Sequence, residues 1–174
     1  MHKESVMENG LTIKKTTEED LENIRDLWNN GTVMYYVGFP EGLGVELETL
    51  KEKWLPAMNK NTSKSHYSIY HEDLGFCGES YYEVDEKGLA ALDIKLMPKT
   101  QGRGIAYAGL KHAISEAFLT GKADFVYVDP HKENAKALKL YERVGFVKKE
   151  HPDPEERDRH YYMELSKSNF MKNT

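Results

Sequence analysis

The segment Gln101–Ala106 reads QGRGIA and lies between a strand-like run, residues 90–97, and an amphipathic helical run, residues 105–119. Glycines at positions 102 and 104 permit positive φ angles and leave backbone N–H groups uncovered. The N–H groups in the first turn of the following helix have no intrahelical partner, and they lie at the positive end of the helix dipole. A strand, a glycine turn and a helix in this order therefore predict a binding site for an anionic ligand such as a phosphate.

Two common phosphate-binding motifs fit this segment poorly. A nucleoside-triphosphate loop requires Gly-x-x-x-x-Gly-Lys-Ser/Thr, and the chain has no such run. A dinucleotide fingerprint requires a third small residue, but Tyr107 occupies that position and is too bulky for close helix–strand packing. Asp124 and Asp129 lie about 20 residues further on, where an acid could bind a ribose, so this alternative is weakened and stays open.

What remains is Gln-x-x-Gly-x-Ala, which resembles the acetyl-CoA loop of the GNAT superfamily of N-acetyltransferases, Arg/Gln-x-x-Gly-x-Gly/Ala. A second motif follows at residues 128–146, where an Asn opens a helical run that ends Leu-Tyr-Glu-x-x-Gly-Phe. Its matching residues are Asn134, Ala137, Leu140, Tyr141, Glu142, Gly145 and Phe146. The two motifs are independent, and one helix and one strand separate them, as the family requires. The resemblance covers residues 74–150 well and indicates a single N-acetyltransferase domain over residues 1–174.

Hydrophobic periodicity and turn residues predict the same order of elements. The expected fold class is α+β, a three-layer α/β arrangement in which helices flank a mixed, mostly antiparallel sheet. The order is β-α-α-β-β-β-α-β-α-β-β, with strands at residues 11–15, 66–71, 76–84, 90–97, 125–128, 146–150 and 160–165. Helices are expected at residues 18–30, 47–58, 102–119 and 135–144. By the resemblance, the fourth and fifth strands splay apart and leave a cleft for a thioester.

The resemblance implies acetyl-CoA as cosubstrate and assigns residues to bind it. The pyrophosphate is expected on the backbone amides of the loop, those of Gln101, Gly102, Arg103, Gly104, Ile105 and Ala106. The Arg103 side chain would add charge at the rim. The pantetheine arm is expected to pair like an extra strand with backbone groups of Leu96 and Met97, and Pro98 ends this pairing because it has no N–H. Asn134 would contact the pantetheine or cap the helix.

Tyr141 is the residue expected to take part in the chemistry. By resemblance its hydroxyl points to the coenzyme sulfur and acts as general acid for the departing thiolate, and a phenol with a pKa of about 10 is protonated at neutral pH. The general base is open, because Ala91 occupies the position that often carries a glutamate in the family. Asp93 shares the strand face of Ala91, and Glu79 lies on the neighbouring strand, so either is a candidate base. Further candidates are Glu83, His131 and His160.

The acceptor is expected beside the aromatic segment between the first two helices and on the third strand. Its candidate residues are Tyr35, Tyr36, Phe39, Glu79 and Tyr81, which offer cation–π contacts and a carboxylate to an amine. The net charge of −5 argues against nucleic acid as a partner and mildly favours a cationic amine. The main hypothesis is direct transfer, in a ternary complex, of an acetyl group from acetyl-CoA to the primary amine of a small molecule or peptide. The alternative is an acyl-CoA-binding regulatory module without turnover, and the missing glutamate at position 91 gives it weight.

Composition and hydropathy predict where such a protein works. The single cysteine, Cys77, has no partner for a disulfide within the chain, which favours a reducing compartment. No apolar run approaches the roughly 18 residues of a membrane span, and residues 1–9 lack an apolar signal core, so we expect a cytoplasmic protein without a membrane partner. The His, Cys and Asp residues show no metal-ligand spacing, so no metal is expected. The resemblance allows a homodimer, with Phe170 and Met171 as candidate interface residues.

Overall fold

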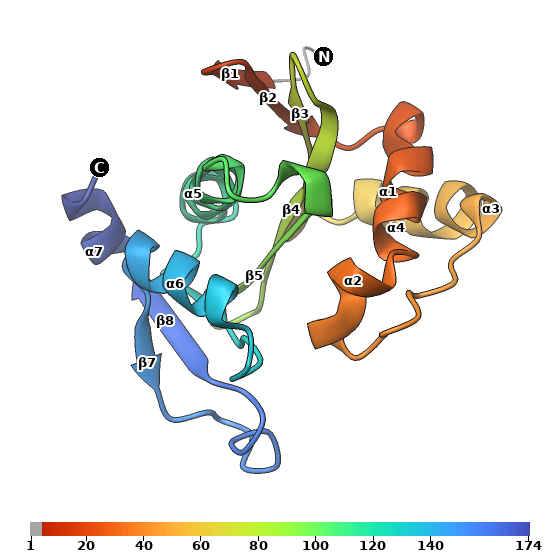
Figure 1. Cartoon of the computed structure of the whole chain (residues 1–174). Helices are drawn as coiled ribbons and strands as arrows, with labels where there is room; N and C mark the ends of the chain where they lie inside the picture. Colours follow the sequence, from red (N-terminus) through yellow and green to blue (C-terminus); the bar gives the residue numbers. More distant parts are fainter. Residues whose placement is uncertain (1–4) are drawn as a thin grey trace.

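The computed structural model describes residues 5–174, through which one eight-stranded sheet runs (Figure 1). The strands are β1 (Ser5–Glu8), β2 (Leu11–Lys15), β3 (Lys64–His71), β4 (Gly75–Val84), β5 (Leu89–Leu96), β6 (Phe125–Val128), β7 (Val147–Lys149) and β8 (Tyr162–Ser166). Their spatial order is β1-β2-β3-β4-β5-β6-β8-β7, and all neighbours are antiparallel except β5 and β6, which are parallel. The mixed, mostly antiparallel sheet of the α+β class is confirmed.

Helices cover both faces of this sheet, which makes three layers (Figure 1). One face carries α5 (Ile105–Leu119), α6 (Ala135–Val144) and α7 (Lys167–Lys172), and the other carries α1 (Leu21–Trp28), α2 (Gly31–Met34), α3 (Leu47–Thr49) and α4 (Leu55–Lys60). Single turns complete the set: the 3-10 turns η1 (Glu18–Asp20), η2 (Tyr35–Val37) and η4 (Pro98–Thr100), and the π-helical η3 (Leu50–Trp54). No helix within residues 5–174 has both the length and the apolar character to cross a membrane.

Two hydrophobic cores hold the layers together. The larger lies between the sheet and α5, where Leu110, Ile114 and Phe118 are buried. They follow the helical spacing of i, i+4 and i+8, so one face of α5 packs on the sheet. The smaller core lies under α1 and η3 and includes Ile24 and Leu50. The sheet therefore carries a separate helical layer, with its own core, on each face.

The parallel strands β5 and β6 pair only at one end. Leu89, Ala90 and Ala91 pair with Phe125, Val126 and Tyr127. Beyond Ala91, residues 92–96 of β5 have no partner strand on that side in the described chain, while β6 stays paired with β8 through Val128. The predicted splay of the fourth and fifth strands of the expected order is confirmed.

Several boundaries differ from the prediction for local reasons. The first helix ends at Trp28 rather than near Asn30, because the Asn30 side chain accepts hydrogen bonds from the amides of Thr32 and Val33 and thereby caps α2. The long helix begins at Ile105 rather than at residue 102, because the glycines at 102 and 104 have φ angles of 76° and 78°, which no right-handed helix accommodates. The last strand covers residues 162–166 instead of 160–165.

Two elements were not predicted. β1 forms a hairpin with β2 through Asn9 and Gly10, both at positive φ, and an Asn-Gly pair is the sequence signal for such a turn. α7 follows Ser166, whose hydroxyl accepts a hydrogen bond from the amide of Asn169. In α7, Phe170 is buried against Phe118 with ring centroids 5.6 Å apart. Phe170 is therefore part of the core, and its prediction as an interface residue is wrong.

Candidate functional site

The loop that follows Gln101 presents a row of free backbone amides, whereas the Gln101 amide, also predicted to bind the pyrophosphate, donates to the carbonyl of Pro98 at 3.4 Å. The first hydrogen bond into α5 runs from the N–H of Ala108 to the carbonyl of Gly104, at 3.3 Å, so the amides of residues 102–107 have no partner within the described chain. They lie at the positive end of a 15-residue helix. No atom lies within 4 Å of where a Cβ would stand at Gly102 or Gly104, and Arg103 is exposed beside them. The loop is thus shaped and charged to receive a pyrophosphate.

At the end of β5, only one of the two predicted pairing residues keeps its backbone off the β4 ladder: Leu96, whose carbonyl accepts a hydrogen bond from Nε2 of Gln101 at 3.5 Å. The N–H of Met97 donates to the carbonyl of Cys77 at 2.8 Å, and the carbonyl of Met97 accepts from the amide and the hydroxyl of Thr100. Because hydrogen-bonded residues alternate along an antiparallel ladder, the backbone groups of Leu96 point away from β4 and toward the gap beside β6. The prediction for a strand-like ligand arm is therefore corrected to Leu96, since the Met97 amide is already used.

Tyr141 lies on α6, and Asn134 is the N-cap residue just before that helix. Tyr141 is buried, with 8% of its surface exposed, and packs edge-on against Phe146. Its hydroxyl has no hydrogen-bond partner among residues 5–174. Burial, and then the charges of Asp93 and Asp129, raise the pKa of Tyr141 above its usual value, so the phenol is protonated at neutral pH. Asn134 caps α6 by accepting a hydrogen bond from the amide of Ala137 at 3.2 Å.

A pocket of about 240 Å³ opens on the opposite sheet face, beneath α1 and α4. Its walls are Trp28, Trp54 and Met58. Its floor consists of alternate residues of three neighbouring strands, namely Lys64 and His66 of β3, Glu79 and Tyr81 of β4, and Asp93 and Lys95 of β5. Side chains alternate across a strand, and the register pairs His66 with Tyr81 and Tyr81 with Asp93, so these six residues share one face. The register of three strands therefore builds the pocket.

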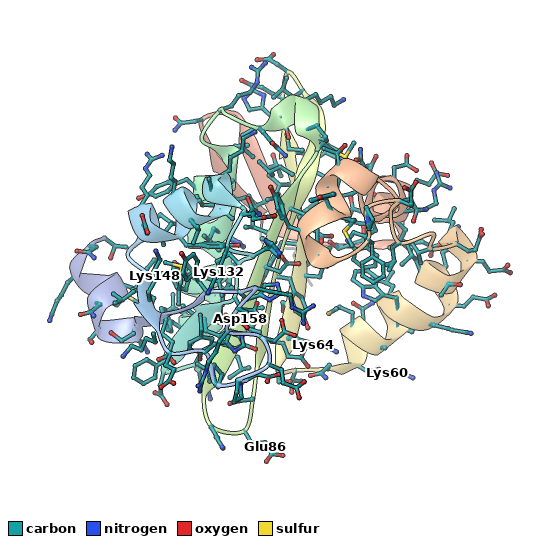
Figure 2. The ribbon with its side chains drawn as sticks, turned by 60° about the horizontal axis from the view of Figure 1, so that its bottom comes forward. Lys60, Lys64, Glu86, Lys132, Lys148 and Asp158 are labelled. Carbon is teal, nitrogen blue, oxygen red and sulfur yellow. The ribbon has the colours of Figure 1, made fainter. Side chains whose placement is uncertain are left out.

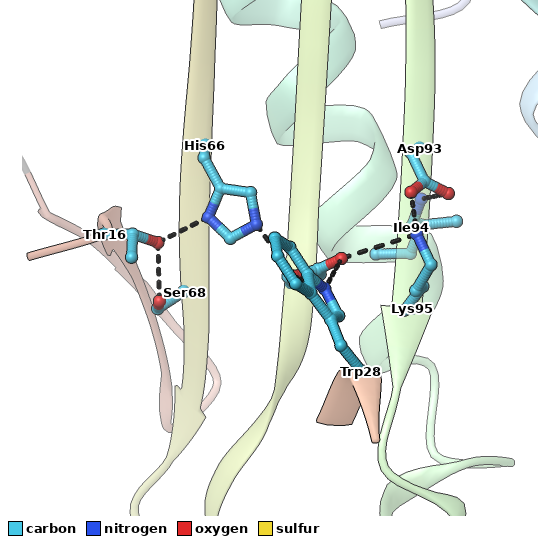
Figure 3. Close-up of polar contacts among 8 residues, drawn as sticks. Thr16, Trp28, His66, Ser68, Asp93, Ile94 and Lys95 are labelled. Carbon is cyan, nitrogen blue, oxygen red and sulfur yellow. Dashed lines mark hydrogen bonds and ion pairs between the residues drawn. The ribbon is translucent and has the colours of Figure 1, made fainter. Parts of the chain in front are cut away.

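Glu79 is the centre of a buried polar network in this floor, and Figure 3 shows its partners Trp28, His66 and Lys95. The indole N–H of Trp28 donates to both of its oxygens, at 2.9 and 2.8 Å, and Nε2 of His66 lies 2.7 Å from Oε2. The network continues from Nδ1 of His66 to the hydroxyls of Thr16 and Ser68, each step 2.7 Å long. Burial alone would raise the pKa of Glu79, but His66, Lys95 and Trp28 outweigh it and lower the pKa to about 2. Such a carboxylate is a weak base, so its predicted role as general base is not supported.

Lys95 joins Glu79 to Asp93. Its Nζ lies 3.5 Å from Oε1 of Glu79 and contacts the Asp93 carboxylate (Figure 3). Burial alone would lower the pKa of Lys95, but the charges of Asp93 and Glu79 outweigh it and raise the pKa, so Lys95 stays cationic. The Asp93 side chain is 42% exposed and lies close enough to Tyr141 to act on its pKa. Of the two predicted bases, Asp93 is the one with access to solvent and to the gap.

The predicted acceptor residues separate into two places. Glu79 and Tyr81 lie in the floor of the pocket, whereas Tyr35, Tyr36 and Phe39 are exposed in and after η2, outside its lining. The hydroxyl of Tyr36 donates to the carbonyl of Glu133, and its ring lies 5.5 Å from that of His131. The aromatic segment therefore reaches across to the connection between β6 and α6.

Six side chains of the pocket were not predicted as site residues: Trp28, Trp54, Met58, Lys64, His66 and Lys95. Trp28, Trp54 and Met58 come from the helical layer and cover the pocket. Strand alternation could have identified Lys64, His66 and Lys95, since they share a sheet face with Tyr81 and Asp93.

His131 and His160, the further base candidates, face each other with ring centroids 5.3 Å apart, and Nδ1 of His160 lies 2.6 Å from Oε2 of Glu156. In the part of the chain that the structure describes, no three His, Cys, Asp or Glu side chains are placed to hold a metal ion.

Comparison with known proteins matches residues 10–147 to the acetyltransferase (GNAT) domain family. Spermidine N(1)-acetyltransferase of Vibrio cholerae is 27% identical over 148 residues, which is 83% of each chain. Aminoglycoside N(6')-acetyltransferase type 1 of Klebsiella pneumoniae is 22% identical over 148 residues, 78% of this chain and 73% of the relative. The solved structure of the Vibrio cholerae spermidine N-acetyltransferase in complex with CoA and spermine has a TM-score of 0.80 at 23% identity, covering 94% of this chain and 99% of that one. This last likeness shows a shared fold.

Proposed function

Because this chain belongs to the acetyltransferase (GNAT) domain family and is an acetyl-CoA-dependent N-acetyltransferase, we propose where each part of the reaction takes place. The pyrophosphate of acetyl-CoA binds the amides of residues 102–107, and the pantetheine arm pairs with the backbone of Leu96, whose carbonyl accepts a hydrogen bond from Nε2 of Gln101 at 3.5 Å until the arm takes its place. Asn134 borders this arm from the opposite side of the gap. The splay of β5 from β6 carries the proposal, because it joins the amide loop to the acceptor pocket. One sheet supports both sites, which favours a single domain over residues 1–174.

Tyr141 assists departure of the thiolate. The amine nitrogen forms a bond to the acetyl carbon, the carbon–sulfur bond breaks, and the electron pair stays on sulfur. The Tyr141 hydroxyl has no other hydrogen-bond partner in the described residues, so it is free to donate to this sulfur. A thiol has a pKa of about 8.5 and a phenol of about 10, so the hydrogen bond itself supplies most of the stabilisation and complete proton transfer is unfavourable.

Asp93 accepts the proton that the amine loses. It lies at the end of the pocket floor toward the gap, and part of its surface reaches solvent, to which the proton can pass. Lys95 holds the carboxylate in place and is itself held by Glu79. Glu79 then has a structural role, since its low pKa makes it a poor proton acceptor. This arrangement supplies a base where Ala91 offers none.

The acceptor is the primary amine of a small molecule. The pocket has a volume of about 240 Å³, which admits a small amine or the end of a peptide. The Vibrio cholerae and Klebsiella pneumoniae relatives are named for spermidine and aminoglycosides, which both carry several amines. Those names support an amine as the acceptor here. The charge and shape of that amine are inferred from the residues that line the pocket.

The test is release of free thiol from acetyl-CoA with a panel of primary amines, comparing Tyr141→Phe with the parent. We expect Tyr141→Phe to lower kcat about 100-fold while the Kd for acetyl-CoA, from calorimetry, stays within about twofold. Tyr35→Phe is the control, because Tyr35 is 57% exposed and outside the pocket, and it should leave kcat unchanged. A Tyr141→Phe enzyme with full kcat would remove Tyr141 from the chemistry.

A further inference from the structure

Each carboxylate of the pocket floor already has a cationic or hydrogen-bonding partner. Glu79 is held by Trp28, His66 and Lys95. Asp93 contacts the same Lys95. Glu83, at the edge of this sheet face, accepts a hydrogen bond from the Tyr81 hydroxyl at 2.7 Å and lies 3.8 Å from Nζ of Lys64. The carboxylates in and beside the pocket therefore already form ion pairs or hydrogen bonds with other side chains of the protein.

The formal charges of the pocket lining cancel. Within the lining, the two lysines, Lys64 and Lys95, equal the two carboxylates, Glu79 and Asp93, in number, and Lys64 also lies near Glu83 at the edge. An acceptor that brought several ammonium groups would carry charge into a site with no unmatched carboxylate to receive it. Desolvating an ammonium group without a partner is costly, so such a ligand is disfavoured.

The walls of the pocket are apolar and aromatic. Trp28 and Trp54 meet edge to face with ring centroids 5.2 Å apart, and Met58 lies beside them. A cavity of roughly 150 Å³ lined by apolar side chains is known to bind benzene. A volume of about 240 Å³ accordingly suits one ring together with a short aminoalkyl chain. The walls select for an apolar body, and the floor selects against additional charge.

We propose that the acceptor is a primary monoamine on a small apolar body, such as an arylalkylamine, and that polyamines are poor substrates. This inference rests on the proposed function of the pocket. The apolar body packs against Trp28 and Trp54, while the single amine lies beside Asp93.

Thiol release from acetyl-CoA with phenethylamine and with spermidine tests the inference. We expect kcat/KM for phenethylamine to exceed that for spermidine at least tenfold. A higher value for spermidine would overturn the inference and leave the proposed function intact. Absence of turnover with both amines and with a broad amine panel would overturn the proposed function and the inference with it.

A charge variant tests the reason for the preference. Figure 2 shows Lys64 nearer the middle of one face of the molecule and Lys60 farther out, and Lys64 lines the pocket whereas Lys60 does not. Lys64→Gln makes the pocket more negative, so we expect the ratio of kcat/KM for spermidine to that for phenethylamine to rise about fivefold. Lys60→Gln, with the same loss of charge, should leave this ratio unchanged. Equal ratios in the two variants, with both folded by circular dichroism, would contradict the charge argument.

Discussion

Replacement of Glu79 by Gln should destabilise the protein in a pH-dependent way. Its pKa falls from an ordinary value of 4.5 to about 2 in the folded protein, which corresponds to about 3 kcal/mol of folding free energy. Glu79 is buried, so solvent does not screen this term. Because the folded-state pKa is depressed, the stabilisation is complete above pH 4.5 and is lost as the pH falls toward 2. Gln cannot reproduce it, since its amide group would face the donors of His66 and Lys95.

Urea unfolding followed by circular dichroism measures this term. At pH 7 we expect Glu79→Gln to lower the free energy of unfolding by about 3 kcal/mol, and near pH 3 the difference should shrink to about 1 kcal/mol. Glu86→Gln, which alters an exposed carboxylate in the turn between β4 and β5, should change it by less than about 0.5 kcal/mol. If Glu79→Gln lowered the free energy of unfolding by less than about 1 kcal/mol at pH 7, or by an amount that does not vary with pH, Glu79 could not be an ionised residue that stabilises the fold.

Three further predictions concern the loop, the core and the thiol. Gly104→Ala should raise the KM for acetyl-CoA about tenfold in steady-state kinetics, because Gly104 has a φ of 78° in the anion loop. The control is Gly44→Ala, at a φ of 71° outside the loop, which should leave this KM unchanged. Gly109→Val should lower the free energy of unfolding by about 1–3 kcal/mol in urea titration, because a Cβ there would lie 2.6 Å from Cδ1 of Ile69, and an unchanged value would contradict this packing. Cys77 should resist thiol reagents in native protein, because it is fully buried and burial raises the pKa of its thiol; rapid labelling without denaturant would contradict this.

The fold was predictable because its signals are local. Alternation in the strands and the apolar face of α5 both depend on residues close together in the chain. The errors were local as well. Asn30 begins a new helix where the first was expected to continue, and the Asn9–Gly10 turn, which was not used as a signal, forms the hairpin of β1 with β2.

The coenzyme half of the candidate site could be predicted better than the acceptor half. The loop that offers its amides to the pyrophosphate is one continuous segment, so its glycines are enough to identify it in the sequence. The exception is Met97. Its backbone N–H donates a hydrogen bond to the carbonyl of Cys77 on β4, and only the register of the two strands reveals this partner. The acceptor pocket combines α1, α4 and three strands, and its aromatic walls proved to be Trp28 and Trp54 rather than the exposed Tyr35 and Phe39.

The sequence by itself indicated the anion loop and most of the order of elements, because these follow from short-range spacing and backbone geometry, and its resemblance to the GNAT family made Tyr141 the candidate acid. Only the tertiary structure decided which charges are available. Glu79 and Asp93 look equivalent in the sequence, yet the sheet register surrounds Glu79 with three donors and leaves Asp93 partly in solvent. The physical reason is that the pKa of a carboxylate depends on its burial and its neighbours, and these neighbours come from segments as far apart as Trp28 and Lys95.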